Sequence, residues 1–85
     1  MTEARIRVRV RLFGIFRELA GAEEREVSLA PRSTVQELVG RLRQEAGWEF
    51  LPPSPAVAVN REYAASERRL AGGDEVALIP PVAGG

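Results

Sequence analysis

The group in this chain best suited to chemistry is the carboxylate of Gly85, which follows Gly84 at the end of the sequence. Neither residue has a Cβ, so this end can enter a narrow channel and lets a partner's backbone approach closely. The alternative is an inert terminus, since the last residues of most domains are poorly ordered and tolerant of change. The position of the pair, just after a strand closed by two prolines, favours a mobile arm that carries its carboxylate into another protein's pocket.

Side chains that commonly perform catalysis near neutral pH are missing from the chain. The sequence contains no histidine and no cysteine. It therefore lacks imidazole acid–base groups, thiol nucleophiles and thiolate metal ligands. Carboxylates and serines are present, but no paired constellation of them stands out. We expect no catalytic side chains, no metal site and no bound cofactor in this chain.

Composition excludes several classes of protein. The 85 residues are enough for one domain with a small core. Twelve acidic and twelve basic residues give a net charge of zero, whereas nucleic-acid binders usually carry a basic excess. No apolar run is long enough to cross a membrane, and the first residues do not form a secretory signal. We expect a cytoplasmic protein that binds neither nucleic acid nor membrane.

The arm is expected to leave the domain from a final strand. Residues 75–79 alternate in the period-two pattern of a half-buried strand. Pro80 and Pro81 end it, because neither can donate a hydrogen bond to the sheet, and they bias the following residues toward an extended form. The sequence thus predicts a domain over residues 1–79 and a flexible tail over residues 80–85. Besides Gly85, the residues expected to insert into a partner are Pro80, Pro81, Val82, Ala83 and Gly84.

Further strands are predicted from alternating patterns over residues 5–13, 24–30 and 56–60, with a short returning segment that begins at Tyr63. In the first strand, arginines alternate with the inward residues. We expect a solvated face there, and the alternative is a surface that docks an acidic partner. Leu70 is expected to fill the core before the turn at residues 71–74.

Two helices are predicted between these strands. Residues 14–20 are expected to form a short helix with Ile15 or Phe16 and also Leu19 facing inward, ended by Gly21. Thr34 and Glu37 form a capping box at the start of the main helix. Its apolar residues follow helical spacing and Gly47 ends the segment; they are Val35, Leu38, Val39, Leu42 and Ala46. Gly40 lies within this helix, where we expect it to permit close packing.

The predicted order is strand, short helix, strand, helix, strand, short strand, strand. One mixed sheet packed on the main helix satisfies all the apolar strand faces, which is the β-grasp arrangement of the α+β class. In that fold the first and last strands are parallel neighbours, so Phe13 and Ile79 lie at the same end of the open face. With Tyr63 they are expected to form an apolar patch beside the tail. Such patches commonly mark protein interfaces, although scattered exposed apolar residues are also ordinary.

The chain resembles the small subunits of molybdopterin synthase, within the MoaD/ThiS family of ubiquitin-like sulfur carriers. The resemblance covers essentially the whole chain, and rests on Leu12-Phe13-Gly14-Ile15-Phe16-Arg17-Glu18-Leu19-Ala20-Gly21, on Val59-Asn60 and on the closing segment Leu70-Ala71-Gly72-Gly73-Asp74-Glu75-Val76-Ala77-Leu78-Ile79-Pro80-Pro81-Val82-Ala83-Gly84-Gly85. The related thiamin sulfur carriers usually lack the first-helix motif and the Pro-Pro-Val tail. This chain departs from the family at Leu78-Ile79, where aromatic residues are frequent.

The resemblance implies that a ubiquitin-activating-like (MoeB-like) enzyme uses ATP to adenylate Gly85, because a carboxylate is a poor electrophile. A sulfur donor then converts Gly85 to a thiocarboxylate. The tail enters the MoaE-like large subunit in a heterotetramer, and the sulfur passes to a cyclic pyranopterin. That subunit is expected to supply the catalytic side chains, so this chain alone is not an enzyme.

Within the resemblance, Phe13, Tyr63 and Ile79 are expected to form the patch that docks both partners. Arg17 and Glu18 match the family motif, and a purely structural role for them stays open. Three alternatives also stay open. The chain is a sulfur carrier for thiamin or tRNA thiolation, a ubiquitin-like protein modifier, or an interaction domain with an inert tail.

Overall fold

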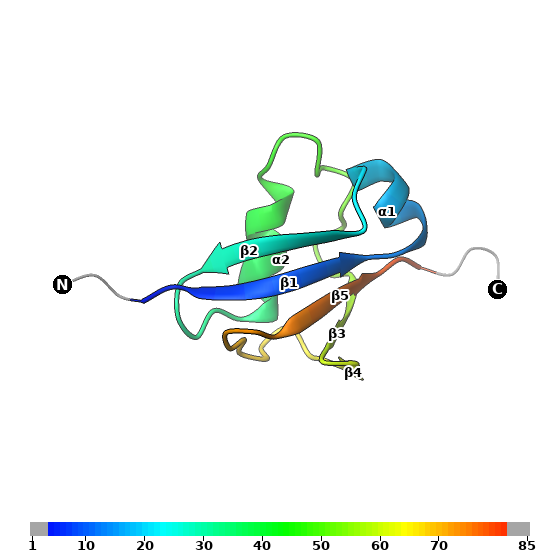
Figure 1. Ribbon diagram of the computed structural model, residues 1–85. Coiled ribbons are helices and arrows are strands. Elements are labelled where there is room, and N and C mark those ends of the chain that lie inside the picture. The colour runs from blue at the N-terminus through cyan, green and yellow to red at the C-terminus, as the bar shows by residue number, and fades with distance from the viewer. Residues whose placement is uncertain (1–3, 82–85) are drawn as a thin grey trace.

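A computed structural model describes residues 4–81 of the chain, and Figure 1 shows its arrangement. The elements are β1 (Ile6–Leu12), α1 (Gly14–Ala20), β2 (Glu24–Leu29), α2 (Val35–Arg43), β3 (Ala56–Val59), β4 (Glu62–Tyr63) and β5 (Glu75–Ile79). The strands form one five-stranded sheet in the order β2-β1-β5-β3-β4. β1 and β5 are parallel, and the other neighbours are antiparallel. The predicted mixed sheet and central parallel pair are confirmed.

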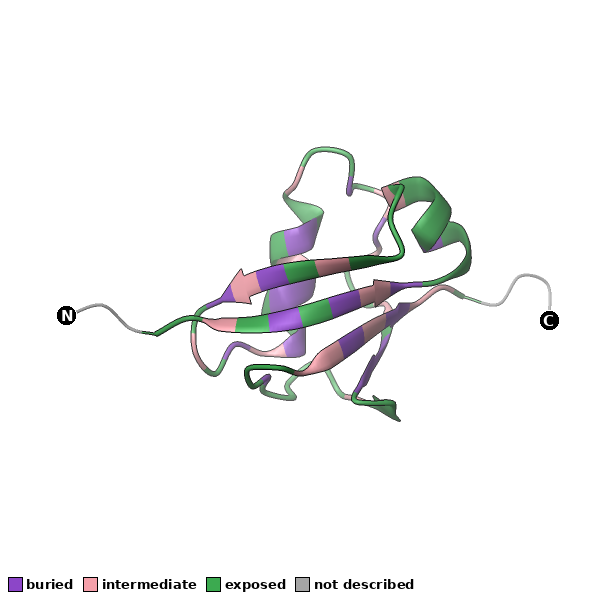
Figure 2. Ribbon diagram, in the orientation of Figure 1, coloured by how far each residue is buried: buried purple, intermediate pink, exposed green. Residues whose placement is uncertain are grey.

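The core lies between the sheet and α2, which crosses one face of it (Figure 1). Buried and exposed residues alternate along β1, as Figure 2 shows, because successive side chains of a strand point to opposite faces. Leu70 is buried as predicted, although it lies outside the regular elements. The core residues of the strands and of α2 are Val8, Val10, Leu12, Val27, Leu29, Val35, Leu38, Val39, Leu42, Val57, Val59, Val76 and Leu78.

α2 begins with the predicted capping box and ends earlier than predicted. The Glu37 amide donates to Thr34 Oγ1 over 3.2 Å, and the Thr34 amide donates to Glu37 Oε1 over 2.8 Å. The last helical residue is Arg43, so the prediction that Ala46 continues the inward face is wrong, and Ala46 is exposed. The chain turns after Arg43 because Trp48 and Leu51 fold back into the core.

Two glycines of the helical regions differ in what they do. Gly21 caps α1 in the left-handed conformation with φ of 73°, as predicted, and its amide donates to the Arg17 carbonyl over 3.0 Å. Gly40 does not permit close packing, because a Cβ added there meets no atom within 4 Å. That prediction is therefore wrong.

α1 contributes only Phe16 to the core, so the prediction that Leu19 faces inward is wrong. Ile15 and Leu19 are both about half exposed. This short helix lies at one end of the sheet (Figure 1), and Phe16 is its buried residue. Phe16 packs against Phe50 with ring centroids 5.8 Å apart, and Phe50 packs in turn on Trp48.

No helix within residues 4–81 has the length and apolar character needed to cross a membrane. Val82, Ala83, Gly84 and Gly85 lie outside the described residues. The division into a domain at residues 1–79 and a tail at residues 80–85 therefore stays a prediction.

Candidate functional site

The sheet face away from α2 is divided into a charged part and an apolar part. The strand register places Arg7, Arg9 and Arg11 of β1 beside Ser28, Glu26 and Glu24 of β2. On the other side of β1, the corresponding positions of β5 and β3 are mostly small or apolar, namely Ala77, Ile79, Ala56 and Ala58. The open face therefore changes from ionic to apolar across the central strand pair.

The predicted patch residues lie around this apolar part. Leu12 pairs with Leu78, so the next residues, Phe13 and Ile79, lie at the same end of the parallel strands. Ile79 is half-buried and Phe13 is exposed. The Arg11 guanidinium lies 5.5 Å from the centre of the Phe13 ring, which places that ring on the same open face.

Tyr63 stands apart from these two residues, at the far edge of the sheet. It pairs with Ala58 of β3, which pairs in turn with Ala77 of β5. Tyr63 is 79% exposed, the highest value among the large apolar residues within residues 4–81. Two alanines therefore form a low floor between Tyr63 and the Phe13–Ile79 side. We call these three large side chains and their floor the docking patch, after the role predicted for them from the sequence.

The route by which the tail leaves the sheet is set by contact between Gly14 and Pro80. Gly14 has φ of +52°, and a Cβ there would lie 3.3 Å from Pro80 Cγ. The missing Cβ thus lets α1 start against the first residue after β5. Phe13 also accepts hydrogen bonds at its carbonyl from the Phe16 and Arg17 amides. Sequence reasoning missed this role of Gly14, whose signal is a glycine between a strand and a helix.

The predictions for Val82, Ala83, Gly84 and Gly85 concern residues outside the described part of the chain. Pro80 is half-buried and Pro81 is exposed. The described structure therefore places the root of the expected tail beside the docking patch and beside the start of α1 (Figure 1).

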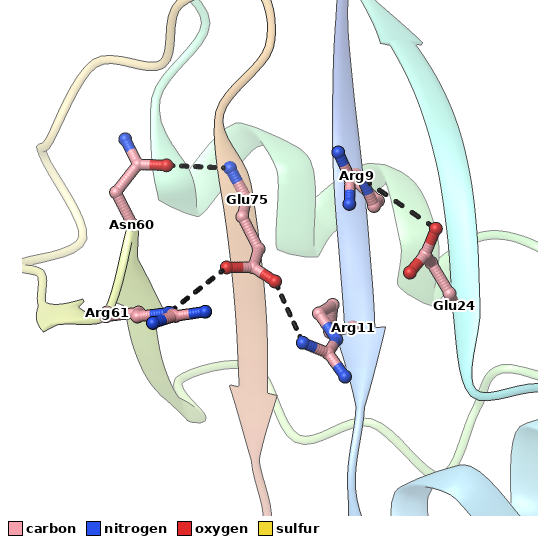
Figure 3. Close-up of polar contacts among 6 residues, drawn as sticks. All are labelled: Arg9, Arg11, Glu24, Asn60, Arg61 and Glu75. Atoms are coloured by element: carbon pink, nitrogen blue, oxygen red, sulfur yellow. Dashed lines mark hydrogen bonds and ion pairs between the residues drawn. The ribbon is translucent and has the colours of Figure 1, made fainter.

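Asn60 joins the turn after β3 to the start of β5. Its Nδ2 donates to Asp74 Oδ1 over 3.0 Å. Its Oδ1 accepts from the Glu75 amide over 3.0 Å, as Figure 3 shows. Asn60 and Arg61 both have positive φ, in a two-residue turn between Val59 and Glu62. Asparagine tolerates this conformation. The Val-Asn and Gly-Asp-Glu motifs therefore hold the end of one strand against the beginning of another.

Glu75 lies between two arginines on the open face, as Figure 3 shows. Arg11 Nη1 donates to Glu75 Oε2 over 3.0 Å, and Arg61 Nε lies 4.0 Å from Glu75 Oε1. Sequence reasoning did not find this cluster, because its members are far apart in the chain. The motif residues Arg17 and Glu18 are exposed on α1, and Arg17 Nη1 lies 3.8 Å from Glu23 Oε1.

Comparison with known proteins identifies the family of this chain. The model of the ThiS family matches residues 10–85. A molybdopterin synthase sulfur carrier subunit from Anopheles gambiae is 33% identical, over 94% of this chain and 93% of its own length. The crystal structure of small archaeal modifier protein 1 from H. volcanii is similar with a TM-score of 0.79 and 29% identity, covering 91% of this chain and 99% of that one.

A third similar protein is subunit 1 of molybdopterin-converting factor from Helicobacter pylori, solved as a complex of subunits 1 and 2. It has a TM-score of 0.68 and 27% identity, covering 94% of this chain and all (100%) of that chain. The family match extends through the diglycine end, and the two structural matches cover 91% and 94% of this chain. The chain therefore belongs to the ThiS family and has the ubiquitin-like β-grasp fold.

Proposed function

We propose that this protein is the sulfur-carrier subunit of a molybdopterin synthase. The observation that carries this proposal is the 33% identity, over 94% of the chain, with the sulfur carrier subunit from Anopheles gambiae. The similar H. pylori subunit 1 forms a complex with subunit 2 of the same converting factor. By analogy, this chain binds a MoaE-like large subunit, with which it forms a heterotetramer that works in the cytoplasm.

The proposed chemistry takes place at Gly85. The carboxylate attacks the α-phosphorus of ATP in a MoeB-like enzyme, forming an acyl adenylate and releasing pyrophosphate. Hydrosulfide supplied by a sulfur donor then attacks the acyl carbon and displaces AMP, leaving a thiocarboxylate. The chain itself binds no cofactor in this scheme, since the activating enzyme holds the ATP.

Sulfur transfer follows in the large subunit, which supplies the catalytic side chains. The thiocarboxylate sulfur bonds to a carbon of the cyclic pyranopterin and displaces an oxygen substituent, which leaves with the electron pair of its C–O bond. Water then cleaves the acyl–sulfur bond to restore the Gly85 carboxylate. Residues 80–84 act as the inserted segment, and Gly84 permits entry into a narrow channel because it lacks a side chain. The docking patch of Phe13, Tyr63 and Ile79 seats the body of the carrier on each partner in turn.

Expression of the chain together with its activating enzyme tests the first step. Intact mass spectrometry should show the increase in mass that results when one oxygen of the Gly85 carboxylate is replaced by sulfur. Deletion of Gly85 is the control and should abolish this gain without lowering the thermal midpoint, because the buried core of the described residues ends at Leu78. An unmodified wild-type mass under these conditions would contradict the proposal.

Reconstitution with the large subunit and cyclic pyranopterin tests the second step. The thiocarboxylated chain should convert the precursor to molybdopterin, whereas the unmodified chain should not. A chain that gains sulfur but fails this conversion is instead a carrier for thiamin or tRNA thiolation, which the family match also accommodates.

A second candidate function is that of a ubiquitin-like protein modifier. The similarity to small archaeal modifier protein 1, with its TM-score of 0.79, favours this candidate. Its test is a search, after tryptic digestion of cells that express the chain, for lysines of other proteins that carry the remnant peptide 70–85, because Arg69 is the last basic residue of the chain. Such remnants should be present only when Gly85 is intact.

A further inference from the structure

The charges on the open face are unevenly matched beside the docking patch. Arg7 Nη1 lies 3.8 Å from Glu26 Oε1, and Arg9 Nε lies 3.7 Å from Glu24 Oε2. These two arginines of β1 thus each have a carboxylate on β2. Glu75, by contrast, faces both Arg11 and Arg61. One carboxylate is therefore shared by two cations at the boundary of the patch.

The two arginines do not share Glu75 equally. Arg11 makes a direct hydrogen bond of 3.0 Å, is 41% exposed and also lies over the Phe13 ring. Arg61 is 4.0 Å from the same carboxylate, and its side chain is 87% exposed. At this distance and exposure the ion pair with Arg61 contributes little to stability. Arg61 is thus the surplus cation of the cluster.

Arg61 also stands at the edge of the docking patch. It lies in the turn that leads into β4, and β4 carries Tyr63. Figure 3 shows its side chain directed toward Glu75 across the start of β5. A partner that covers Tyr63 and Ile79 therefore has Arg61 at its margin. Interfaces commonly have an apolar centre with a charged margin, where complementary charges speed association and select the partner.

We propose that Arg61 is a recognition residue, and that the large subunit presents an apolar surface to the docking patch with a carboxylate facing Arg61. This inference rests on the proposed function and specifies, in addition, that the partner's contact surface carries a negative charge opposite Arg61. Because Glu75 is already held by Arg11, a carboxylate on the partner gains a cation without displacing an existing close pair. A basic margin on a partner would instead meet a like charge.

Two substitutions that each remove one charge should act in opposite directions on binding to the large subunit. Arg61→Gln removes the surplus cation and should slow association about two- to five-fold at low ionic strength. Glu75→Gln removes the shared carboxylate, leaves both arginines unneutralised, and should speed association by a similar factor of about two to five. Both effects should shrink in high salt, because exposed charges are screened there. A loss of fold would slow both variants.

The experiment measures association and dissociation rates of the full chain with the purified large subunit from the same source organism, at low and high salt. Arg68→Gln is the matched control. Arg68 is an exposed arginine whose carbonyl accepts from the Val35 amide at the start of α2, away from the patch. No ion pair of Arg68 occurs within residues 4–81. Its substitution should leave the association rate at the wild-type value.

The outcomes separate this inference from the proposed function. Equal low-salt association rates for wild type, Arg61→Gln and Glu75→Gln would overturn the role of Arg61 while leaving the sulfur-carrier function in place. Faster association of Arg61→Gln would overturn it as well, since the partner's margin would then be basic. Failure of the wild-type chain to bind the large subunit would overturn both proposals.

Discussion

The same strands form both faces of the sheet, and the two faces differ in burial and in composition. In β5, Leu78 is completely buried against the helix side, whereas its neighbour Ile79 is half-buried on the open face. In β1, buried Val10 and Leu12 alternate with Arg9 and Arg11 (Figure 2). Adjacent residues thus face the core and the proposed partner surface in turn, which predicts that mutational effects on folding and on binding alternate along each strand.

The edge of the covered face shows how a charged residue can belong to the core side. Arg25 of β2 pairs with Val10 in the register and therefore points to the covered side. Its guanidinium lies 5.3 Å from the centre of the Trp48 ring and donates to Glu45 Oε2 over 2.8 Å. Because β2 is an edge strand, this side chain closes the rim of the core and keeps its charge paired.

The largest effect on folding should come from the covered face. Leu78→Ala removes a completely buried side chain and should lower the free energy of unfolding by about 2–5 kcal/mol. Denaturant-induced unfolding measures this change. The affinity of the remaining folded protein for the large subunit should stay near wild type. An unchanged unfolding free energy would contradict the assignment of Leu78 to the core.

The open face should show the reverse pattern. Ile79→Asp should weaken binding to the large subunit about 10- to 100-fold, as loss of a central interface residue does. The free energy of unfolding should fall by less than about 1 kcal/mol, because the new side chain remains at the surface. A binding titration measures the affinity, and chemical unfolding measures the free energy of unfolding. Phe13→Asp should have the same two effects as Ile79→Asp. Equal losses in folding and binding would mean that these residues belong to the core.

Two glycine substitutions compare the contact between Gly14 and Pro80 with the open surface at Gly40 of α2. Gly14→Ala places a Cβ 3.3 Å from Pro80 Cγ at a positive φ and should cost about 1–2 kcal/mol of unfolding free energy. Gly40→Ala is the matched control in α2, where the space is open, and should stabilise by about 0.5–1 kcal/mol. Thermal unfolding distinguishes the signs. Destabilisation by both changes would indicate close packing around α2.

The smallest effect is expected in the ionic part of the open face. Arg9→Gln breaks an exposed pair with Glu24 at 3.7 Å and should change the free energy of unfolding by no more than about 0.5 kcal/mol. Unfolding at low and high salt measures it. A loss as large as that of Leu78→Ala would show that the charged part of this face also holds the fold together.

Local patterns in the sequence determined the identity of the elements. Period-two alternation identified the strands, and the Thr34–Glu37 capping box identified the start of α2, because these signals depend on residues a few positions apart. The order of elements then predicted the parallel β1–β5 pair and with it the neighbouring positions of Phe13 and Ile79. Helix spacing alone did not show that Phe16, and not Leu19, enters the core.

Tertiary structure decided the contacts between residues distant in the chain. The sharing of Glu75 by Arg11 and Arg61, the bond between Asn60 and Asp74 and the approach of Pro80 to Gly14 all join separate elements. Such pairings depend on strand register and on the direction in which each turn leaves the sheet. Neither the register nor the turn direction follows from the local spacing of side chains. The sequence by itself therefore predicted the patch and its tail, whereas the packed sheet decided which charged residues surround them.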